Sequence, residues 1–372
     1  MQAWVTLALF VFACIASSCR PAREVHETLR ASSDAPTEGA TGPDPRDREP
    51  PDEPVVVLVV LDGARWQEVF TGADPRLSAE AAVPAVHADA LMPHLHALVA
   101  EHGAALGAPG HGTAIAASGP NFVSLPGYTE IFTGRRTHDC ADNDCAPAQL
   151  PTVVDEARAI SSRPSEVAVI ASWQKIGRAA SVDPANIVLS TGRYRTSHED
   201  ALLGDAVMRD ALERGSQAEA YPGYGEFRPD RFTAALGLRY LETRRPRFMF
   251  LGLGEPDEYA HRDDYAGYLA SLRASDATLG ELFAVLGRMG TRGAHTTVIV
   301  TADHGRGRDY RVHGRAFPES ARVSLVAAGR GIEARGFAQA TRPHHLADVA
   351  PTAGAPLDEL LAGPLERTAM QP

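Results

Sequence analysis

Aspartate and histidine side chains follow three apolar segments of this 372-residue sequence. Asp62 comes directly after the first segment, in LDGARWQEVFTG. Asp257 follows the second segment in EPDEYAH, and His261 lies four residues further on. Carboxylates and neutral imidazoles are good ligands for zinc and similar divalent ions. The spacing therefore predicts that these side chains take part in binding metal.

The third apolar segment, TTVIVT, is also followed by an aspartate and by histidines. Asp303 and His304 lie in TADHG, and His313 comes nine residues after His304. A single aspartate at the end of a strand is more often a helix cap or a solvated turn than a metal ligand. Three strand ends that each supply an aspartate are harder to explain in that way. His344 and His345 compete with His313 as the late histidine ligand.

A serine lies between the first and the second of these segments, at the start of a predicted helix. Ser124 opens SLPGYTEIFTG. The common role of a serine at such a place is to cap the helix. The N-terminus of a helix also directs backbone N–H groups and a dipole toward an anion. A metal ion can turn a hydroxyl there into a nucleophile by lowering its pKa, so both roles stay open at this point.

The apolar segments have the character of buried strands. Unbroken runs rich in β-branched residues are typical of strands covered on both faces. Such runs span residues 55–61, 167–171, 248–252 and 296–301. Helix-like stretches between them span residues 92–102, 149–159, 231–243 and 265–288. This alternation predicts an α/β fold, a doubly wound and mostly parallel sheet with helices on both faces and with its chemistry at the carboxyl ends of the strands.

The N-terminal part of the sequence is expected to be a targeting segment followed by a tether. Residues 1–18 have the character of a secretory signal, because their apolar run is too short to span a bilayer. Small residues before Cys19 resemble a bacterial lipobox, so Cys19 is a candidate lipid anchor; an ordinary signal peptide is the alternative. Residues 19–53 are Pro-rich and predict a disordered tether. We expect a catalytic domain over residues 54–365, in the periplasm or at the outer membrane.

Composition excludes several classes of protein. Hydrophobic residues make up 44% and charged residues 22%, which is ordinary for a globular chain and unlike a collagen, a coiled coil or a disordered protein. The net charge of −11 gives no reason to expect nucleic-acid binding. The four cysteines include no CxxC spacing. Cys140 and Cys145 could close a small disulfide in an oxidising compartment.

Taken in order, these motifs resemble those of the alkaline phosphatase superfamily of metal-dependent phospho- and sulfohydrolases. The resemblance covers most of residues 55–355 and rests on LDGARWQEVFTG, SLPGYTEIFTG, EPDEYAH and TADHG. It implies two divalent ions, zinc first and manganese or magnesium as alternatives. One ion would be held by Asp62, Ser124, Asp303 and His304. The other would be held by Asp257, His261 and the late histidine, which we assign to His313.

The resemblance also implies a reaction. Ser124 would attack phosphorus to form a phosphoseryl intermediate, which water would then hydrolyse. Asn143 is the second candidate catalytic residue, because some phosphodiesterase-like members carry an asparagine shortly after the nucleophile helix; its alternative role is to turn the loop DNDC. Tyr128 stands where the formylglycine pattern of sulfatases needs an arginine, which argues against an ordinary sulfatase.

The choice among substrates depends on basic residues. Phosphomonoesterases usually direct an arginine or lysine at the substrate dianion, and none of the candidates stands out among Arg65, Arg135, Arg136, Lys175 and Arg306. This favours a small-molecule phosphodiester as the substrate. A phosphomonoester, a phosphonate and a sulfate ester at the same site are alternatives. A metal-binding lipoprotein without turnover is the alternative outside enzymes.

Overall fold

The computed structural model describes residues 55–136 and 139–350. These residues belong to one compact unit, Pro50–Pro372. The expected signal segment, the tether and Cys19 lie outside them. Within the described ranges, no helix combines the length and the apolar character that a membrane span requires.

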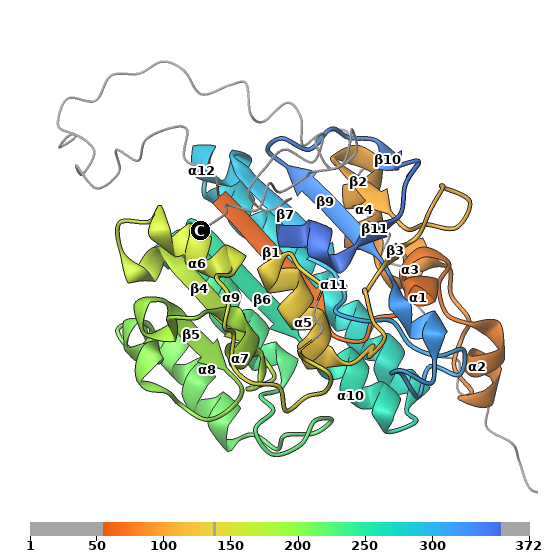
Figure 1. The fold of residues 1–372 in the computed structure, drawn as a ribbon, viewed down its shortest axis with the longest axis horizontal. Helices are drawn as coiled ribbons and strands as arrows, with labels where there is room; N and C mark the ends of the chain where they lie inside the picture. The colour runs from red at the N-terminus through yellow and green to blue at the C-terminus, as the bar shows by residue number, and fades with distance from the viewer. Residues whose placement is uncertain (1–54, 137–138, 351–372) are drawn as a thin grey trace, which may run out of the picture. The chain divides into compact units, whose positions relative to one another are not determined.

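A sheet of eight strands forms the centre of the fold (Figure 1). Its strands are β1 (Val55–Leu61), β2 (Gly103–Leu106), β4 (Val167–Ala171), β5 (Val188–Thr191), β6 (Phe248–Leu253), β7 (Thr296–Thr301), β9 (Leu325–Gly329) and β10 (Gly336–Phe337). They are ordered β10-β2-β9-β7-β1-β6-β4-β5. Only β9 runs antiparallel to its neighbours within this described sheet. The predicted mostly parallel α/β sheet is therefore confirmed.

The apolar segments became the central strands because both of their faces are covered. All seven residues of β1 are buried. β1 lies between β6 and β7, with Val59 opposite Leu251 on one side and Val300 on the other. The four predicted strands correspond to β1, β4, β6 and β7, and only β6 ends one residue later than expected.

β5, at the edge of the sheet, was not predicted from the sequence. The sequence of β5 is VLST, and its second half is polar. Four residues with that composition are too short to give a recognisable apolar run.

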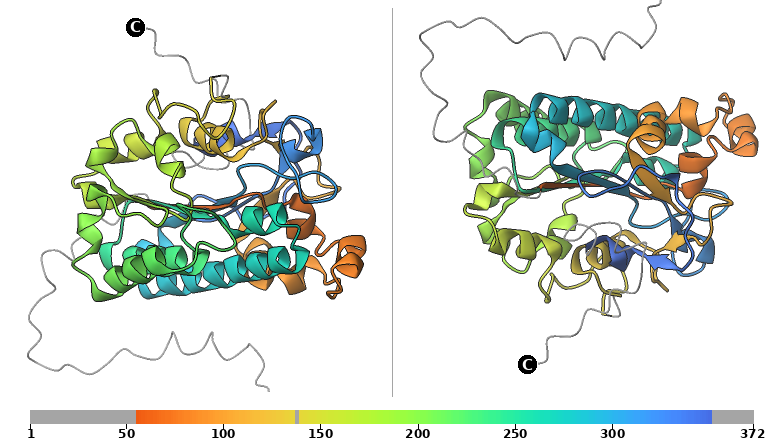
Figure 2. Two further views of the ribbon diagram at one scale, coloured as in Figure 1. Left: turned by 90° about the horizontal axis from the view of Figure 1, so that it is seen from below. Right: turned by 90° about the horizontal axis from the view of Figure 1, so that it is seen from above.

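Helices cover both faces of the sheet (Figure 2). One face carries α4 (Pro93–Glu101), α8 (Ala206–Gln217), α9 (Asp230–Arg244) and α11 (Tyr265–Arg288), and the other carries α5 (Ser124–Thr133), α6 (Val153–Ala159) and α7 (Ile176–Ala180). The predicted helices correspond to α4, α6, α9 and α11. The helix α6 begins four residues later than expected, because Thr152 and Asp155 form a capping box at its start.

Smaller elements complete the described chain. A three-stranded sheet is ordered β11-β3-β8. Its strands are β3 (Ile115–Ala116), β8 (Arg322–Val323) and β11 (His344–His345). Short helices are α1 (Trp66–Phe70), α2 (Pro75–Glu80), α3 (Ala88–Leu91), α10 (Glu255–His261) and α12 (Thr291–Ala294). Of these, α10 bears directly on the site, because it follows β6 at the carboxyl edge of the sheet.

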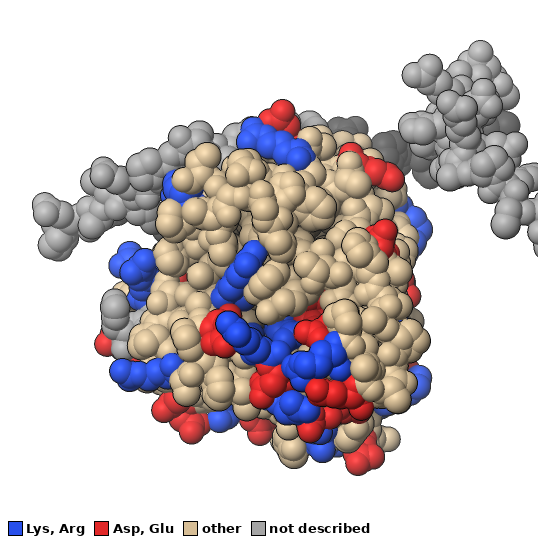
Figure 3. Space-filling view, turned by 90° about the vertical axis from the view of Figure 1, so that its right-hand side faces the viewer, with Lys and Arg blue, Asp and Glu red and all other residues tan. Residues whose placement is uncertain are grey.

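Charges of both signs are intermingled on the face of the molecule in Figure 3. Basic and acidic side chains gather in its lower half, while uncharged side chains cover most of the rest. Ion pairs among the described residues include Arg76 with Glu80 and Arg311 with Asp263. This face therefore shows no continuous basic surface. That the chain does not bind nucleic acid stays a prediction.

Candidate metal centre and active site

The three predicted ligand-bearing segments meet at one edge of the sheet. β1, β6 and β7 are parallel neighbours, so their carboxyl ends lie together. Asp62 follows β1, and its backbone N–H donates to the carbonyl of Leu253 at the end of β6, at 2.9 Å. Asp257 lies in the first turn of α10, and Asp303 follows β7. Side chains far apart in the sequence are thereby brought into one cluster.

Ser124, Asp62, Asp303 and His304 form the first group of side chains. His304 Nε2 lies 3.3 Å from Ser124 Oγ, 3.7 Å from Asp62 Oδ1 and 3.5 Å from Asp303 Oδ2. Ser124 Oγ also lies 3.4 Å from Asp62 Oδ1. All four side chains are buried. This is the set expected for one of the two ions.

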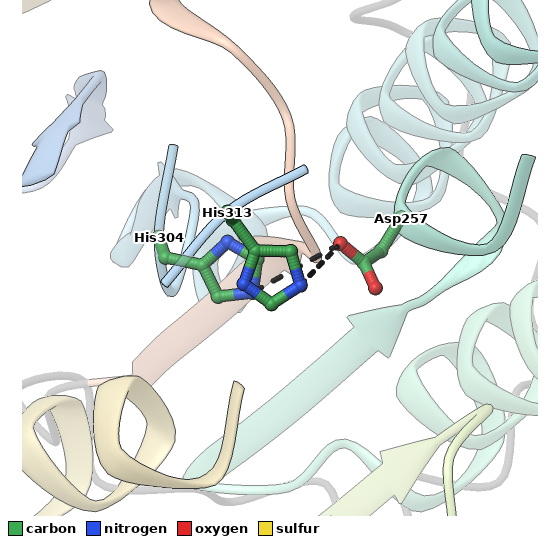
Figure 4. A group of neighbouring side chains, drawn as sticks. All are labelled: Asp257, His304 and His313. Atoms are coloured by element: carbon green, nitrogen blue, oxygen red, sulfur yellow. Dashed lines mark ion pairs between the residues drawn. The ribbon is translucent and has the colours of Figure 1, made fainter. Parts of the chain in front are cut away.

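Asp257, His261 and His313 form the second group. Asp257 Oδ2 lies 3.0 Å from His261 Nε2, and His313 Nε2 lies 3.0 Å from the same nitrogen. Figure 4 shows the rings of His304 and His313 stacked, each with a nitrogen directed at the Asp257 carboxylate. His304 therefore lies within reach of both groups, and the two sites adjoin each other.

Backbone carbonyls set the tautomers of two of these histidines. His313 Nδ1 lies 2.7 Å from the carbonyl oxygen of Phe122, and His304 Nδ1 lies 2.9 Å from that of Gly305. A carbonyl only accepts, so the proton of each neutral ring is on Nδ1. Each Nε2 then presents a lone pair to the cluster, as a metal ligand requires.

The structure places the two competing histidines away from the cluster. His344 is buried with its Nδ1 3.4 Å from Asp348 Oδ2. His345 Nε2 lies 3.2 Å from a guanidinium nitrogen of Arg136. Of the three late histidines, the geometry brings only His313 to Asp257.

Two glycines allow the segments to approach one another. Gly63 has φ +62°, and a Cβ there would lie 2.4 Å from Asp257 Oδ1. Gly127 lies on α5, where a Cβ would lie 2.2 Å from the carbonyl oxygen of Asp303. Both positions exclude a side chain. This explains the glycine in LDG and the one in SLPG.

Ser124 does not cap its helix. Val123 occupies the N-cap position of α5, and Ser124 is the first helical residue. Its hydroxyl instead faces Asp62 and His304. Tyr128 lies one turn later and donates its hydroxyl proton to Asp62 Oδ2 at 3.0 Å, a contact the sequence analysis missed. The spacing of four residues from Ser124, on the same helix face, was the available signal.

Two of the three carboxylates at the site, those of Asp62 and Asp303, lack nearby positive charge within the described part of the chain. Burial, together with the charges of Asp303 and Asp257, raises the pKa of Asp62 well above its ordinary value. Burial and the charge of Asp257 raise the pKa of Asp303 to about 8. Burial also acts to raise the pKa of Asp257, but Arg306 and the histidines His261 and His313 outweigh it and lower that pKa well below its usual range.

The residues present fit a pair of divalent cations. Asp303 Oδ2 is buried and has no hydrogen-bond partner within residues 55–136 and 139–350. A buried carboxylate oxygen without a partner is costly, and a cation removes that cost. Burial and the nearby charge of His313 lower the pKa of His304 well below its ordinary value, which keeps its ring neutral and able to bind metal. The donor set of carboxylates and imidazoles suits zinc.

Two of the candidate basic residues turn out to be structural. Arg306 is 1% exposed and donates to Asp257 Oδ1 and to the carbonyl oxygen of Arg311. Arg65 is also 1% exposed and pairs with Glu68. Both guanidinium groups are therefore occupied inside the protein. Arg306 holds the Asp257 carboxylate in place, a contact that the sequence offered no means to predict.

A cavity of about 320 Å³ opens onto the first group of side chains. It is lined by Asp62, Ser124, Asn143, Trp173, Lys175, Tyr224, Gly225, Glu226, Phe227, Gly254, Asp257, Glu258 and His261. Asn143 Oδ1 accepts a hydrogen bond from the backbone N–H of Leu125 at 2.9 Å. Lys175 is the one basic candidate on this wall, and no motif of the sequence set it apart from the other basic candidates.

The predicted disulfide between Cys140 and Cys145 is confirmed. It closes the segment that carries Asn143. Cys140 is buried, and its Sγ lies 3.8 Å from the Thr129 hydroxyl of α5. The loop is therefore fixed against the helix that begins at Ser124.

Comparisons with known proteins agree with this geometry. The model of the Metalloenzyme superfamily matches residues 233–357, the part of the chain that carries Asp257, His261, Asp303, His304 and His313. A comparison with curated proteins gave no match.

Solved structures show the same fold. A substituted form of alkaline phosphatase PafA has a TM-score of 0.53 at 12% identity, over 82% of this chain and 96% of that one. A 2-O GAG sulfatase has a TM-score of 0.50 at 13% identity, over 85% and 73%. The lipoteichoic acid synthase LtaP from Listeria monocytogenes has a TM-score of 0.50 at 11% identity, over 81% and 71%. Residues 233–357 therefore match the Metalloenzyme superfamily, and the chain shares the fold of these solved structures, as the resemblance to the alkaline phosphatase superfamily predicts.

Proposed function

We propose that this chain hydrolyses phosphate esters, with a preference for phosphodiesters, through a covalent phosphoseryl intermediate on Ser124. One observation carries the proposal. The Ser124 hydroxyl lies at the start of α5 and contacts both His304 Nε2 and Asp62 Oδ1, at 3.3 and 3.4 Å. A serine hydroxyl in contact with two candidate metal ligands is placed to act as a nucleophile.

The residues around Ser124 fit such a reaction. Divalent ions held by the two ligand sets would lower the pKa of the hydroxyl and polarise the phosphoryl oxygens. Ser124 Oγ would lose its proton to solvent and form a bond to phosphorus, while the bond to the leaving alkoxide breaks on the opposite side; water would then hydrolyse the phosphoseryl ester and restore the hydroxyl. The backbone N–H of Ser124 has no partner among the residues that the structure describes, so it is a donor for a non-bridging oxygen. The dipole of α5 favours the same anion.

Asn143 supplies a second donor. Because the N–H of Leu125 can only donate, its partner on Asn143 is the carboxamide oxygen. The Asn143 amide nitrogen is then left with two protons on the cavity side. We assign it to the second non-bridging oxygen of the substrate.

A phosphomonoesterase is the second candidate, and Lys175 favours it. Lys175 lines the same cavity as Ser124 and Asn143. An ammonium group at that place could pair with the second negative charge of a monoester. Its Nζ lies 2.8 Å from Asp144 Oδ1, however, so its charge is already paired. This pairing supports the phosphodiester.

The residues that line the cavity restrict the charge and size of the group that the phosphate ester can carry. Trp173 and Tyr224 supply aromatic surface, while Glu226 and Glu258 supply acidic groups. Burial, together with the charge of Asp257, raises the pKa of Glu258 to about 7. This wall disfavours an extended polyanion such as a sulfated polymer. It suits a small ester with one anionic group at the metal centre and an uncharged organic group outside it.

A substrate panel tests the function. We would measure kcat/KM of the zinc-loaded full chain on bis-p-nitrophenyl phosphate, p-nitrophenyl phosphate, p-nitrophenyl phenylphosphonate and p-nitrophenyl sulfate. We expect the diester to be hydrolysed fastest. A faster monoester would make the enzyme a phosphatase, and a faster phosphonate or sulfate would replace the proposal with one of those activities.

We also propose that the enzyme works outside the cytoplasm, attached through a lipid on Cys19. The short apolar run before Cys19 supports this, and so does the Cys140–Cys145 disulfide, since disulfides persist in oxidising compartments. The intact mass of protein extracted from membranes tests it. A mature chain that begins with acylated Cys19 is expected, and an unmodified Cys19 would contradict the anchor.

A further inference from the structure

The loop that carries Asn143 also carries Asp144, which contacts Lys175 on the cavity wall. The disulfide between Cys140 and Cys145 closes residues 140–145, and we call this segment the CADNDC loop. Asn143 ties the loop to α5 through the N–H of Leu125. The next residue, Asp144, points at Lys175, with 2.8 Å between Oδ1 and Nζ.

The position of Asp144 is set by the whole loop. The Asp144 backbone N–H donates to Asp142 Oδ1 at 2.8 Å. The hydrogen bond of Asn143 to α5 and the disulfide hold its neighbours. The Asp144 side chain is 82% exposed, and that of Lys175 is 31% exposed. An ion pair so open to water contributes little to the stability of the fold. Its main effect is therefore on the charge that Lys175 presents at the cavity wall.

Lys175 is the only lysine in the sequence. Its ammonium group is a strongly hydrated point charge that can donate three hydrogen bonds, and Asp144 accepts one of them. The lysine lowers the pKa of the Asp144 carboxyl, chiefly through this hydrogen bond, so the partner is ionised at neutral pH. A phosphate group near Ser124 therefore meets a paired charge and is attracted less than it would be by a free ammonium.

We propose that Asp144 is a specificity-determining residue that neutralises Lys175 and so favours monoanionic diesters over dianionic monoesters. The CADNDC loop holds the carboxylate in place for this role. The proposal rests on the proposed function, because it assumes that a phosphoryl group binds beside Ser124. It differs from a role for Lys175 as a clamp, since that role requires a free ammonium.

The substitution Asp144→Asn tests it, because it keeps the shape and removes the charge. The ratio of kcat/KM for p-nitrophenyl phosphate over bis-p-nitrophenyl phosphate should rise about fivefold, in line with the strength of an exposed ion pair. The rise should shrink in high salt, because exposed charges are screened. When Asp144→Asn is added to Lys175→Met, the ratio should equal that of Lys175→Met alone, because no ammonium group is left for Asp144 to neutralise.

Two further variants separate charge from structure. Asp139 lies just outside the CADNDC loop and is exposed. Asp139→Asn makes the same change in net charge and should leave the ratio as in the wild type. The pair Cys140→Ser with Cys145→Ser frees the loop and should shift the ratio in the same direction as Asp144→Asn.

Calorimetric titration with inorganic phosphate gives a readout that does not need turnover. Asp144→Asn should bind the dianion about fivefold more tightly, and only when Lys175 is present. A ratio and a phosphate affinity that both stay at the wild-type values would overturn the inference, as would a fall in monoester activity. If the wild type hydrolyses no phosphate ester, the proposed function fails and with it the specificity role; phosphate binding that tightens only when Lys175 is present would then still show that Asp144 neutralises Lys175.

Discussion

Ser124 Oγ lies 3.3 Å from His304 Nε2, although 180 residues separate the two in the sequence. The contact arises because α5 packs its first turn against the backbone after β7, where Gly127 leaves room for the carbonyl of Asp303. Through this contact the nucleophile and a candidate metal ligand form one unit.

Removing the Ser124 hydroxyl should abolish turnover and leave most of the metal in place. The other three members of the first ligand group remain in Ser124→Ala. We expect kcat to fall by a factor on the order of 10³ or more, because the covalent route is lost. Steady-state kinetics and metal analysis on the same sample check this. Wild-type activity in the variant would end the covalent proposal.

The second ion should depend on Asp257. Its carboxylate contacts His261 and His313, so Asp257→Asn should reduce the metal content toward one ion per chain. Glu258→Gln is the matched control, since Glu258 lines the same cavity but belongs to neither ligand group. Elemental analysis after dialysis measures both. Two ions retained in the Asp257 variant would show that the assignment is wrong.

Zinc affinity should increase with pH. Burial raises the pKa of Asp303 to about 8, so in the metal-free protein this carboxyl holds a proton at neutral pH that the ion must displace. Zinc should therefore bind more tightly as pH rises from about 6 to 8. Competition titrations with a chelator across this range check the trend. An affinity independent of pH would contradict the buried, protonated carboxyl, and activity that survives chelation would contradict metal dependence.

Stability should fall as pH rises when metal is bound, because of a second buried carboxyl. Burial and the charge of Glu255 raise the pKa of Asp230 to about 8, far above the value of an unfolded chain. At pH values between the unfolded and the folded pKa, only the folded state holds the proton. The contribution of this proton to the free energy of unfolding is therefore complete at low pH and is lost as pH rises through 8. One such proton gives a slope of about 1.4 kcal/mol per pH unit.

Urea unfolding at pH 6, 7 and 8 with saturating zinc measures this slope. Asp230→Asn should flatten it. Asp205→Asn is the control: Asp205 is partly buried, but its hydrogen bond with Arg239 lowers its pKa, so it releases no proton in this range. Equal slopes in the wild type and the Asp230 variant would be inconsistent with a protonated Asp230.

Loss of Asn143 should weaken catalysis on both ester classes. Asn143→Ala removes a donor placed for a non-bridging oxygen, and losses for such donors are about 100-fold in kcat. Asp142→Ala is the comparison within the same loop, because among the described residues the Asp142 side chain accepts a hydrogen bond only from the backbone N–H of Asp144. If Asn143→Ala matches Asp142→Ala, Asn143 only shapes the loop.

Much of the site could be predicted because its ligands follow the most apolar strands. β1, β6 and β7 are recognisable from composition alone, and parallel neighbours must end at one edge. His313 was assigned over His344 only through the resemblance, and the fold supplies the physical reason, because the loop that carries His313 returns to α10. The pairs Arg306–Asp257 and Lys175–Asp144 were not predictable, because loop geometry rather than any local pattern brings each of them together.

The most direct test of the account is to look for the covalent intermediate. The zinc-loaded full chain would be mixed with bis-p-nitrophenyl phosphate, quenched in acid during turnover and digested for mass spectrometry. We expect a phosphoryl ester on the peptide that contains Ser124, absent from Ser124→Ala. Turnover without any modification of Ser124, or a modification on another residue, would contradict the central claim.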